Sequence, residues 1–126
     1  MIKVFCYFNL HKKCFSLKSV KTGRVIAHLH RAVLVGASAK VSEAGRQRVL
    51  RERRKNVHAG IVGYWLPDDN IPAGTIPEGV GKQIRYNPYK GPNFTFDDGA
   101  IVSGEYPAAV LSVTDERPKV EIIENL

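Results

Sequence analysis

The residues best suited to chemistry form a cationic run between positions 45 and 58, which holds five arginines and a single acid. A guanidinium is always charged, and its planar fork matches two phosphate oxygens. On a helix, Arg51, Arg54 and His58 would follow one another at i, i+3 and i+7 and share one face. We expect these three residues and Arg48 to contact a phosphate-bearing ligand. A solvated charged face is the alternative.

A second cluster interleaves aromatic rings with cations and an amide. A base-stacking site needs a ring face, donors for the edge of the base and cations for its phosphate. A proline after the amide restricts the backbone, so the side chains would be presented from a rigid loop. Tyrosines that only pack over a sheet would have the same spacing, and that alternative stays open. The ligand-binding residues predicted here are Arg85, Tyr86, Asn87, Tyr89 and Lys90.

Other residue types give little support for catalysis or metal binding. No serine or cysteine lies in a nucleophile motif, and no pair of carboxylates stands out. Cys6, Cys14 and a histidine match no common zinc spacing, and His28 and His30 share one face of a predicted strand without a third ligand. We therefore expect a protein that is not an enzyme and that holds neither a cofactor nor a metal.

The elements that would position these residues begin with a β-meander. Residues 2–9 have a period-2 pattern rich in β-branched and aromatic side chains, which predicts a strand. Both faces of this strand would carry apolar groups. Residues 14–20 predict a second strand, and residues 24–30 and 32–35 an interrupted third one that ends at Gly36. Short hairpin connections imply antiparallel pairing.

A helix is predicted next, over about 42–56. Ser42 is a suitable N-cap, and Glu43 places a carboxylate in the first turn, where the helix dipole favours it. The apolar face is narrow and centres on Val49 and Leu50, so we expect this basic helix to lie on a sheet along one edge.

The rest of the chain predicts more strands around an irregular loop at 66–81, which is rich in proline and glycine. The fold class predicted is α+β, a mostly antiparallel sheet made of the N-terminal meander and C-terminal strands, with one main helix. Residues 1–126 would form a single domain. The predicted C-terminal strands cover 57–65, 80–86, 108–114 and 120–123, with a hairpin turn at 97–99 between 94–96 and 100–102.

Charge is segregated along the chain, whose overall net charge is +7. Residues 1–55 hold 14 basic and two acidic side chains, whereas residues 56–126 hold five basic and ten acidic ones. A cationic half recruits phosphate-bearing ligands or polyanions, and the acidic half would repel a long duplex. The alternative is that the halves neutralise each other, within the fold or across the interface of a homo-oligomer.

The two cysteines are too few for a disulfide framework. If the first hairpin turns around Leu10, Cys6 and Cys14 lie opposite each other and a cross-hairpin disulfide becomes conceivable. No apolar stretch approaches the roughly 20 residues that span a bilayer, and no signal peptide is recognisable. We therefore expect a cytosolic chain without membrane contact and with two reduced, mostly buried thiols.

Three segments resemble a family of small tailed-bacteriophage proteins: FNLHKKCFS at 8–16, KVSEAGRQRVLRERRKNVHAGIVG at 40–63 and RYNPYK at 85–90. Together they cover less than half of the chain. The resemblance implies a phage origin and a location in the host cytoplasm, and it implies no particular chemistry.

These observations lead to one main hypothesis and two alternatives. The main one is a non-enzymatic phage protein that binds a phosphate-bearing nucleotide, such as a host defence signal that it sequesters. The first alternative is a protein that binds DNA or RNA with the same cations. The second is an inhibitor whose basic helix docks on an acidic host protein. A concave pocket suits a nucleotide, whereas a convex basic stripe suits a polymer.

Overall fold

The computed structural model describes residues 1–41, 59–67, 81–87, 93–114 and 117–124. All regular structure in this part is β-strand, and every pairing between strands is antiparallel. The strands are β1 (Ile2–Asn9), β2 (Cys14–Ser19), β3 (Val25–Leu29), β4 (Arg31–Val41), β5 (Ala59–Trp65), β6 (Gly81–Tyr86), β7 (Phe94–Phe96), β8 (Glu105–Thr114) and β9 (Arg117–Ile123).

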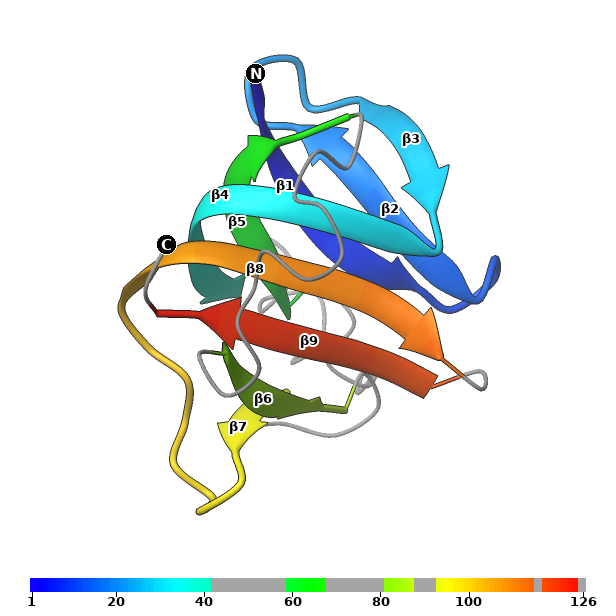
Figure 1. The fold of residues 1–126 in the computed structure, drawn as a ribbon. Helices are drawn as coiled ribbons and strands as arrows, with labels where there is room; N and C mark the ends of the chain where they lie inside the picture. Colours follow the sequence, from blue (N-terminus) through cyan, green and yellow to red (C-terminus); the bar gives the residue numbers. More distant parts are fainter. Residues whose placement is uncertain (42–58, 68–80, 88–92, 115–116, 125–126) are drawn as a thin grey trace.

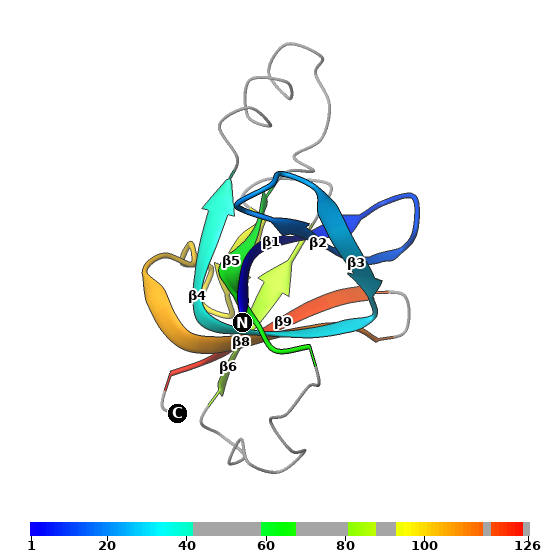
Figure 2. The ribbon, with the colours of Figure 1, turned by 90° about the horizontal axis from the view of Figure 1, so that it is seen from above.

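One nine-stranded sheet has the order β3-β2-β1-β5-β4-β8-β9-β6-β7. The sheet is strongly bent, and its two halves face each other (Figures 1 and 2). Rings that are far apart in the strand order show this closure. Tyr86 on β6 lies 6.5 Å from Phe8 on β1 and 6.4 Å from Phe15 on β2, measured between ring centroids.

The long strand β4 belongs to both halves, because it pairs with β5 on one edge and with β8 on the other. Its register against β5 gains one residue between Val35 and Ser38, which is a β-bulge. Gly36 lies in that bulge with φ of 62°, a left-handed conformation that glycine adopts without steric cost. A bulge bends a strand, so Gly36 lets β4 turn from one half of the sheet into the other.

The core lies between the two halves. Aliphatic and aromatic side chains that alternate along the strands fill it, as expected for the covered face of an antiparallel sheet. The largest fully buried apolar side chains in this core are Phe15, Leu17, Leu34, Ile61, Leu111, Ile122, Val4 and Val120. Val33 and Ile123 are also fully buried, but they belong to a second, smaller cluster with Ala108 and Val110.

The predicted α+β class is wrong for the part of the chain that the structure describes, which is all-β. A sheet with one apolar face must be covered, and we expected a helix to cover it. Here the other half of the same sheet covers that face. The helix predicted at 42–56 and most of the loop predicted at 66–81 lie outside the described residues.

The N-terminal meander is confirmed, since β1, β2 and β3 are neighbours in the sheet. The interrupted third strand is instead two strands with different partners, and β4 continues beyond Gly36 to Val41. Both cysteines are buried free thiols, as predicted, but they are not opposite each other. Cys6 pairs with Leu17, and Cys14 pairs with Asn9.

Candidate functional site

The outer face of β1 carries two aromatic rings. Side chains alternate along a strand, so Val4 and Cys6 enter the core while Phe5 and Tyr7 lie on the opposite face. The two rings are partly buried, their centroids are 6.0 Å apart and their planes are 26° from parallel. This face therefore presents a stacked aromatic pair to its surroundings.

The strand register sets lysines on both sides of this pair. Lys18 on β2 is directly opposite Phe5. On the other side, Tyr7 is opposite Gly60 on β5, and Gly60 is in turn opposite Lys40 on β4. Both lysines are exposed. Partners in an antiparallel ladder project to the same face, so the lysines and the rings share one surface.

Gly60 allows the Phe5 ring to lie against the backbone of β5. A Cβ atom at position 60 would collide with the carbonyl oxygen of Cys6 and would come within 2.8–2.9 Å of two Phe5 ring atoms. Contacts this short force a neighbour to move. The absence of a side chain at position 60 is therefore a condition for the observed position of the ring.

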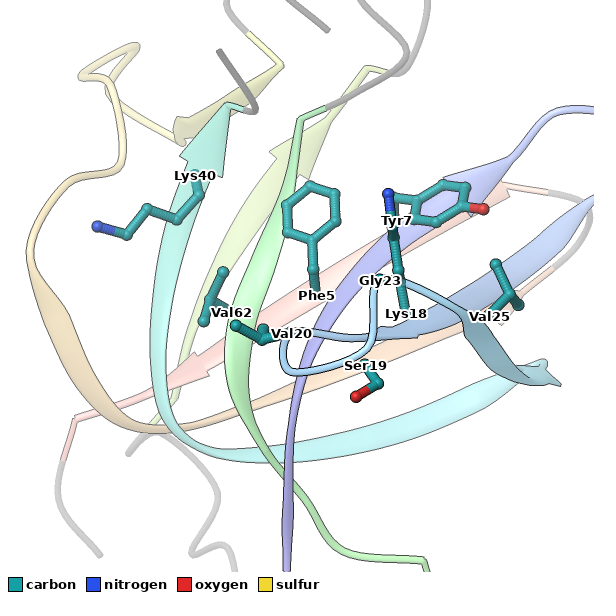
Figure 3. Close-up of a pocket in the computed structure, with 9 residues that line it drawn as sticks. All are labelled: Phe5, Tyr7, Lys18, Ser19, Val20, Gly23, Val25, Lys40 and Val62. Carbon is teal, nitrogen blue, oxygen red and sulfur yellow. The ribbon is translucent and has the colours of Figure 1, made fainter. Parts of the chain in front are cut away.

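These residues line a hollow of about 610 Å³ (Figure 3). Binding sites for small molecules typically measure about 300–1,000 Å³. Part of its rim is the turn between β2 and β3, where the Ser19 amide donates to the Arg24 carbonyl oxygen at 2.8 Å. The hollow is lined by Phe5, Tyr7, Lys18, Ser19, Val20, Gly23, Val25, Lys40 and Val62.

The surroundings of the hollow are cationic. None of its lining residues is acidic, and residues 1–41 hold eight lysines and arginines without a single aspartate or glutamate. The acidic side chains that the structure describes all belong to the segment from 97 to 124. A concave surface with charge of one sign attracts anions.

A polar network lies beside Tyr7. The hydroxyl of Ser16, which pairs with Tyr7, is 2.7 Å from Nδ1 of His28 and accepts a hydrogen bond from the Asn9 side-chain amide at 3.2 Å. Ser16 is fully buried, so its oxygen cannot reach a substrate. The network ties β1, β2 and β3 together.

Of the predicted ligand residues, Arg85, Tyr86 and Asn87 lie in the described part of the chain. Arg85 is exposed, and its Nε lies 3.8 Å from an Asp97 carboxylate oxygen. The backbone amide of Asn87 donates to the Asn93 carbonyl oxygen at 2.8 Å, which extends the β6–β7 pairing by one hydrogen bond.

Tyr86 lies in the core. This agrees with the alternative that the tyrosines of this cluster pack on the sheet and do not contact a ligand. Its ring stacks on Phe94 with centroids 4.6 Å apart, and its hydroxyl donates to the Ala59 carbonyl oxygen at 3.5 Å. Burial raises the pKa of the Tyr86 hydroxyl, a backbone hydrogen bond from Phe8 lowers it, and the neighbouring Cys6 thiol raises it. A ring in this position cannot also stack on a base.

The remaining predicted ligand residues lie outside the described residues: Arg48, Arg51, Arg54, His58, Tyr89 and Lys90. The hollow was not predicted from the sequence, although one signal pointed to it. The strand at 2–9 has apolar residues on both faces, whereas a strand with one solvated face usually has them on one. The aromatic residues on its second face are Phe5 and Tyr7.

Within the described ranges there is no helix long and apolar enough to span a membrane. The same residues contain no group of three or more histidine, cysteine, aspartate or glutamate side chains placed to hold a metal ion.

The fold and the hollow define a small β-sheet protein with a basic, aromatic outer face, and sequence comparison places it among bacteriophage proteins. The model of the Mycobacterium phage L5 gene 82 protein family matches residues 1–117. The chain is 40% identical to the gene 82 protein of Mycobacterium phage L5 over 103 residues, which cover 74% of this chain and 76% of that protein. The chain belongs to this family, and the predicted resemblance to small phage proteins is confirmed. No solved structure matches it at a significant level.

Proposed function

We propose that this phage protein binds a nucleotide on the outer face of β1 in the infected host cell, without catalysing a reaction. The observation that carries the proposal is the stacked Phe5–Tyr7 pair on a concave surface that has lysines and no acids. The base would stack on the exposed ring surface, and Lys18 and Lys40 would hold phosphate oxygens. This keeps the nucleotide hypothesis that the sequence suggested and places it at different residues.

Two physical arguments favour this function over a solvated sheet face. Aromatic rings exposed on a strand leave apolar surface in contact with water, which a stacked base would cover. Stacking on a protein ring contributes about 1 to 3 kcal/mol per base. The flanking ammonium groups attract a phosphate, and no carboxylate in the hollow opposes that attraction.

The proposal is tested by removing the rings and keeping the sheet. Nucleotide binding is measured by calorimetry with ATP, a cyclic dinucleotide and the oligonucleotide dT8 as probes. Phe5→Leu and Tyr7→Leu keep an apolar side chain but remove the flat face, and each should weaken binding about tenfold. Circular dichroism and urea unfolding establish that each variant is folded.

The matched control is Tyr64→Leu. Tyr64 lies on β5 opposite Lys3, so it is on the same face of the sheet, but it does not line the hollow. It is also exposed. Its loss should leave binding unchanged within twofold. Equal losses for all three tyrosine and phenylalanine variants, or no binding of any of the three probes, would contradict the proposal.

A further inference from the structure

The cations near the Phe5–Tyr7 pair are spread out. Lys3 precedes Phe5 by two residues on the same face of β1, and Lys18 on β2 is beside Phe5. Lys40 is on β4, which is three strands away from β2 in the sheet order, so each strand-to-strand spacing counts as one step. At about 4.8 Å per step, three steps separate the backbones of Lys18 and Lys40 by about 14 Å. In Figure 3 the Phe5 ring is seen between these two lysines. A single phosphate group cannot contact all three ammonium groups in their relaxed positions, whereas several phosphates along a chain can.

The rings are also arranged in series. Phe5 and Tyr7 are two residues apart on one strand, which separates their backbone positions by about 6.6 Å. The observed distance between ring centroids is 6.0 Å. A repeat of this size along the strand suits successive bases of an extended single strand, each stacked on its own ring.

A duplex does not fit this arrangement, because its bases are stacked on one another and paired, with only their edges accessible in the grooves. Stacking on a protein ring requires splayed, unpaired bases. The described acidic side chains lie between residues 97 and 124, so a long stiff duplex that extends beyond the hollow on this small protein would meet repulsive charge.

We infer that the ligand of this site is a single-stranded nucleic acid, with two successive bases on Phe5 and Tyr7 and neighbouring phosphates on Lys3, Lys18 and Lys40. This inference rests on the proposed nucleotide site and specifies its ligand class. The three lysines and two rings together span a site of about three to four nucleotides, near the lower limit for single OB-type domains.

A length series on the unaltered protein tests the inference. Unlabelled dTMP, dT2, dT4, dT8 and dT12 compete with fluorescein-labelled dT8, and anisotropy reports displacement. Affinity should rise at least a hundredfold from dTMP to dT4 and less than tenfold from dT4 to dT12. A dT12·dA12 duplex should compete at least tenfold more weakly than dT12. Replacing dT8 by rU8 identifies the preferred polymer, and binding of either one supports the inference.

Salt dependence gives a second measurement. Each phosphate contact to a single strand contributes about −0.7 to the slope of log affinity against log salt, so three lysines predict a slope of about −2. Lys18→Gln should reduce the magnitude of this slope by about 0.7. The control is Lys21→Gln, an exposed cation in the turn after β2 that does not line the hollow, and it should leave the slope unchanged.

The outcomes separate this inference from the proposed function. If dTMP or ATP competes as well as dT8, and Phe5→Leu still weakens binding, the inference fails and the nucleotide site stands. If the duplex competes as well as dT12, stacking of unpaired bases is excluded and the inference fails. If neither mononucleotides nor oligonucleotides bind, both proposals fail.

Discussion

Two aromatic pairs in this molecule have nearly the same angle between their ring planes and opposite surroundings. Phe5 and Tyr7 are 26° from parallel on the outer face of the sheet, and Tyr86 and Phe94 are 24° from parallel in the core. The inner centroids are 4.6 Å apart and the outer ones 6.0 Å. The inner pair is packed between the two halves of the sheet. The outer pair has one half of the sheet beneath it and lysines around it.

The comparison shows that the position of a tyrosine in the alternating pattern of its strand determines whether the ring lies in the core or on the outer face. On β6, Ile84 and Tyr86 share the inner face while Gln83 and Arg85 project outward. On β1, Tyr7 alternates with the buried Cys6 and Phe8 and therefore faces outward. Alternation alone thus separates a core tyrosine from a surface one.

The largest expected effect is on stability, when Tyr86 is compared with Tyr7. Tyr86→Ala should lower the free energy of unfolding by about 3–5 kcal/mol, because it leaves a cavity beside Phe8, Phe15 and Phe94. Tyr7→Ala should cost about 1 kcal/mol, a typical value for a partly buried site. Urea unfolding followed by circular dichroism measures both variants.

If Tyr86→Ala does not fold, Tyr86→Phe still tests the packing of the ring. This variant keeps the ring and removes the hydroxyl with its hydrogen bonds to the backbone of Ala59 and Phe8, which should cost less than about 1.5 kcal/mol. Equal losses in the free energy of unfolding for Tyr86→Ala and Tyr7→Ala would contradict the placement of one aromatic pair in the core and the other on the outer face.

The next effect concerns the glycine beneath the outer pair. Gly60→Ala should destabilise the fold by about 3 kcal/mol, at the upper end for overpacking, because its Cβ collides with the Cys6 carbonyl oxygen and the Phe5 ring. Gly63→Ala is the matched control on the same strand. Its nearest neighbours would be at 3.0 Å, so its cost should be smaller. An equal or greater cost at Gly63 would show that the Phe5 ring does not rest on Gly60.

Two buried titratable groups, Cys6 and Tyr86, should also make stability depend on alkaline pH. Burial raises the pKa of Cys6 above its ordinary value of 9.0 and that of Tyr86 above its ordinary value of 10.0. As the pH rises, these groups ionise first in the unfolded chain, which stabilises the unfolded state. Stability is therefore fully present below about pH 8 and is lost above pH 9, by about 1.4 kcal/mol per pH unit for each group that has reached its ordinary pKa.

Urea unfolding at pH 7, 8, 9, 10 and 10.5 measures this loss, which for Cys6 alone should reach about 2 kcal/mol at pH 10.5. Cys6→Ala is less stable at neutral pH but should lose less stability between pH 8 and 10.5 than the unaltered chain. Identical pH profiles for the two proteins would contradict a buried, neutral Cys6 thiol.

The sequence predicted the strands well because each has its own period-2 pattern and its own turn residues. The hairpin at 97–99 is an example, with β7 before it and an isolated bridge from Thr95 to Ile101 across it. The closure of the sheet could not be predicted in the same way. It depends on pairing between strands distant in sequence, such as β4 with β8, and on a left-handed Gly36 that looked like the end of a strand.

The candidate site was missed for a related reason. Lys18, Phe5, Gly60 and Lys40 come from four strands, and only the register of β2, β1, β5 and β4 brings them onto one surface. Local clusters of cations and rings, such as the one around Tyr86, attracted the prediction because they are contiguous in sequence. A contiguous cluster on a strand is divided between two faces, and here one member of it entered the core.

The smallest expected effect is at Arg85, which shares a strand with Tyr86 and projects to the opposite face. Its guanidinium and the Asp97 carboxylate are 3.8 Å apart, with side-chain exposures of 78% and 77%. Pairs this exposed contribute little, because water and salt screen the attraction and two long side chains lose rotamer freedom. Arg85→Ala should therefore change the free energy of unfolding by less than about 0.5 kcal/mol, and Asp97→Asn by a similar amount.

Binding of dT8 to the Arg85→Ala variant decides whether Arg85 contacts the ligand, as the sequence suggested. Because Arg85 does not line the hollow, we expect unchanged affinity, and a loss of tenfold or more would extend the nucleic-acid surface from β1 to β6.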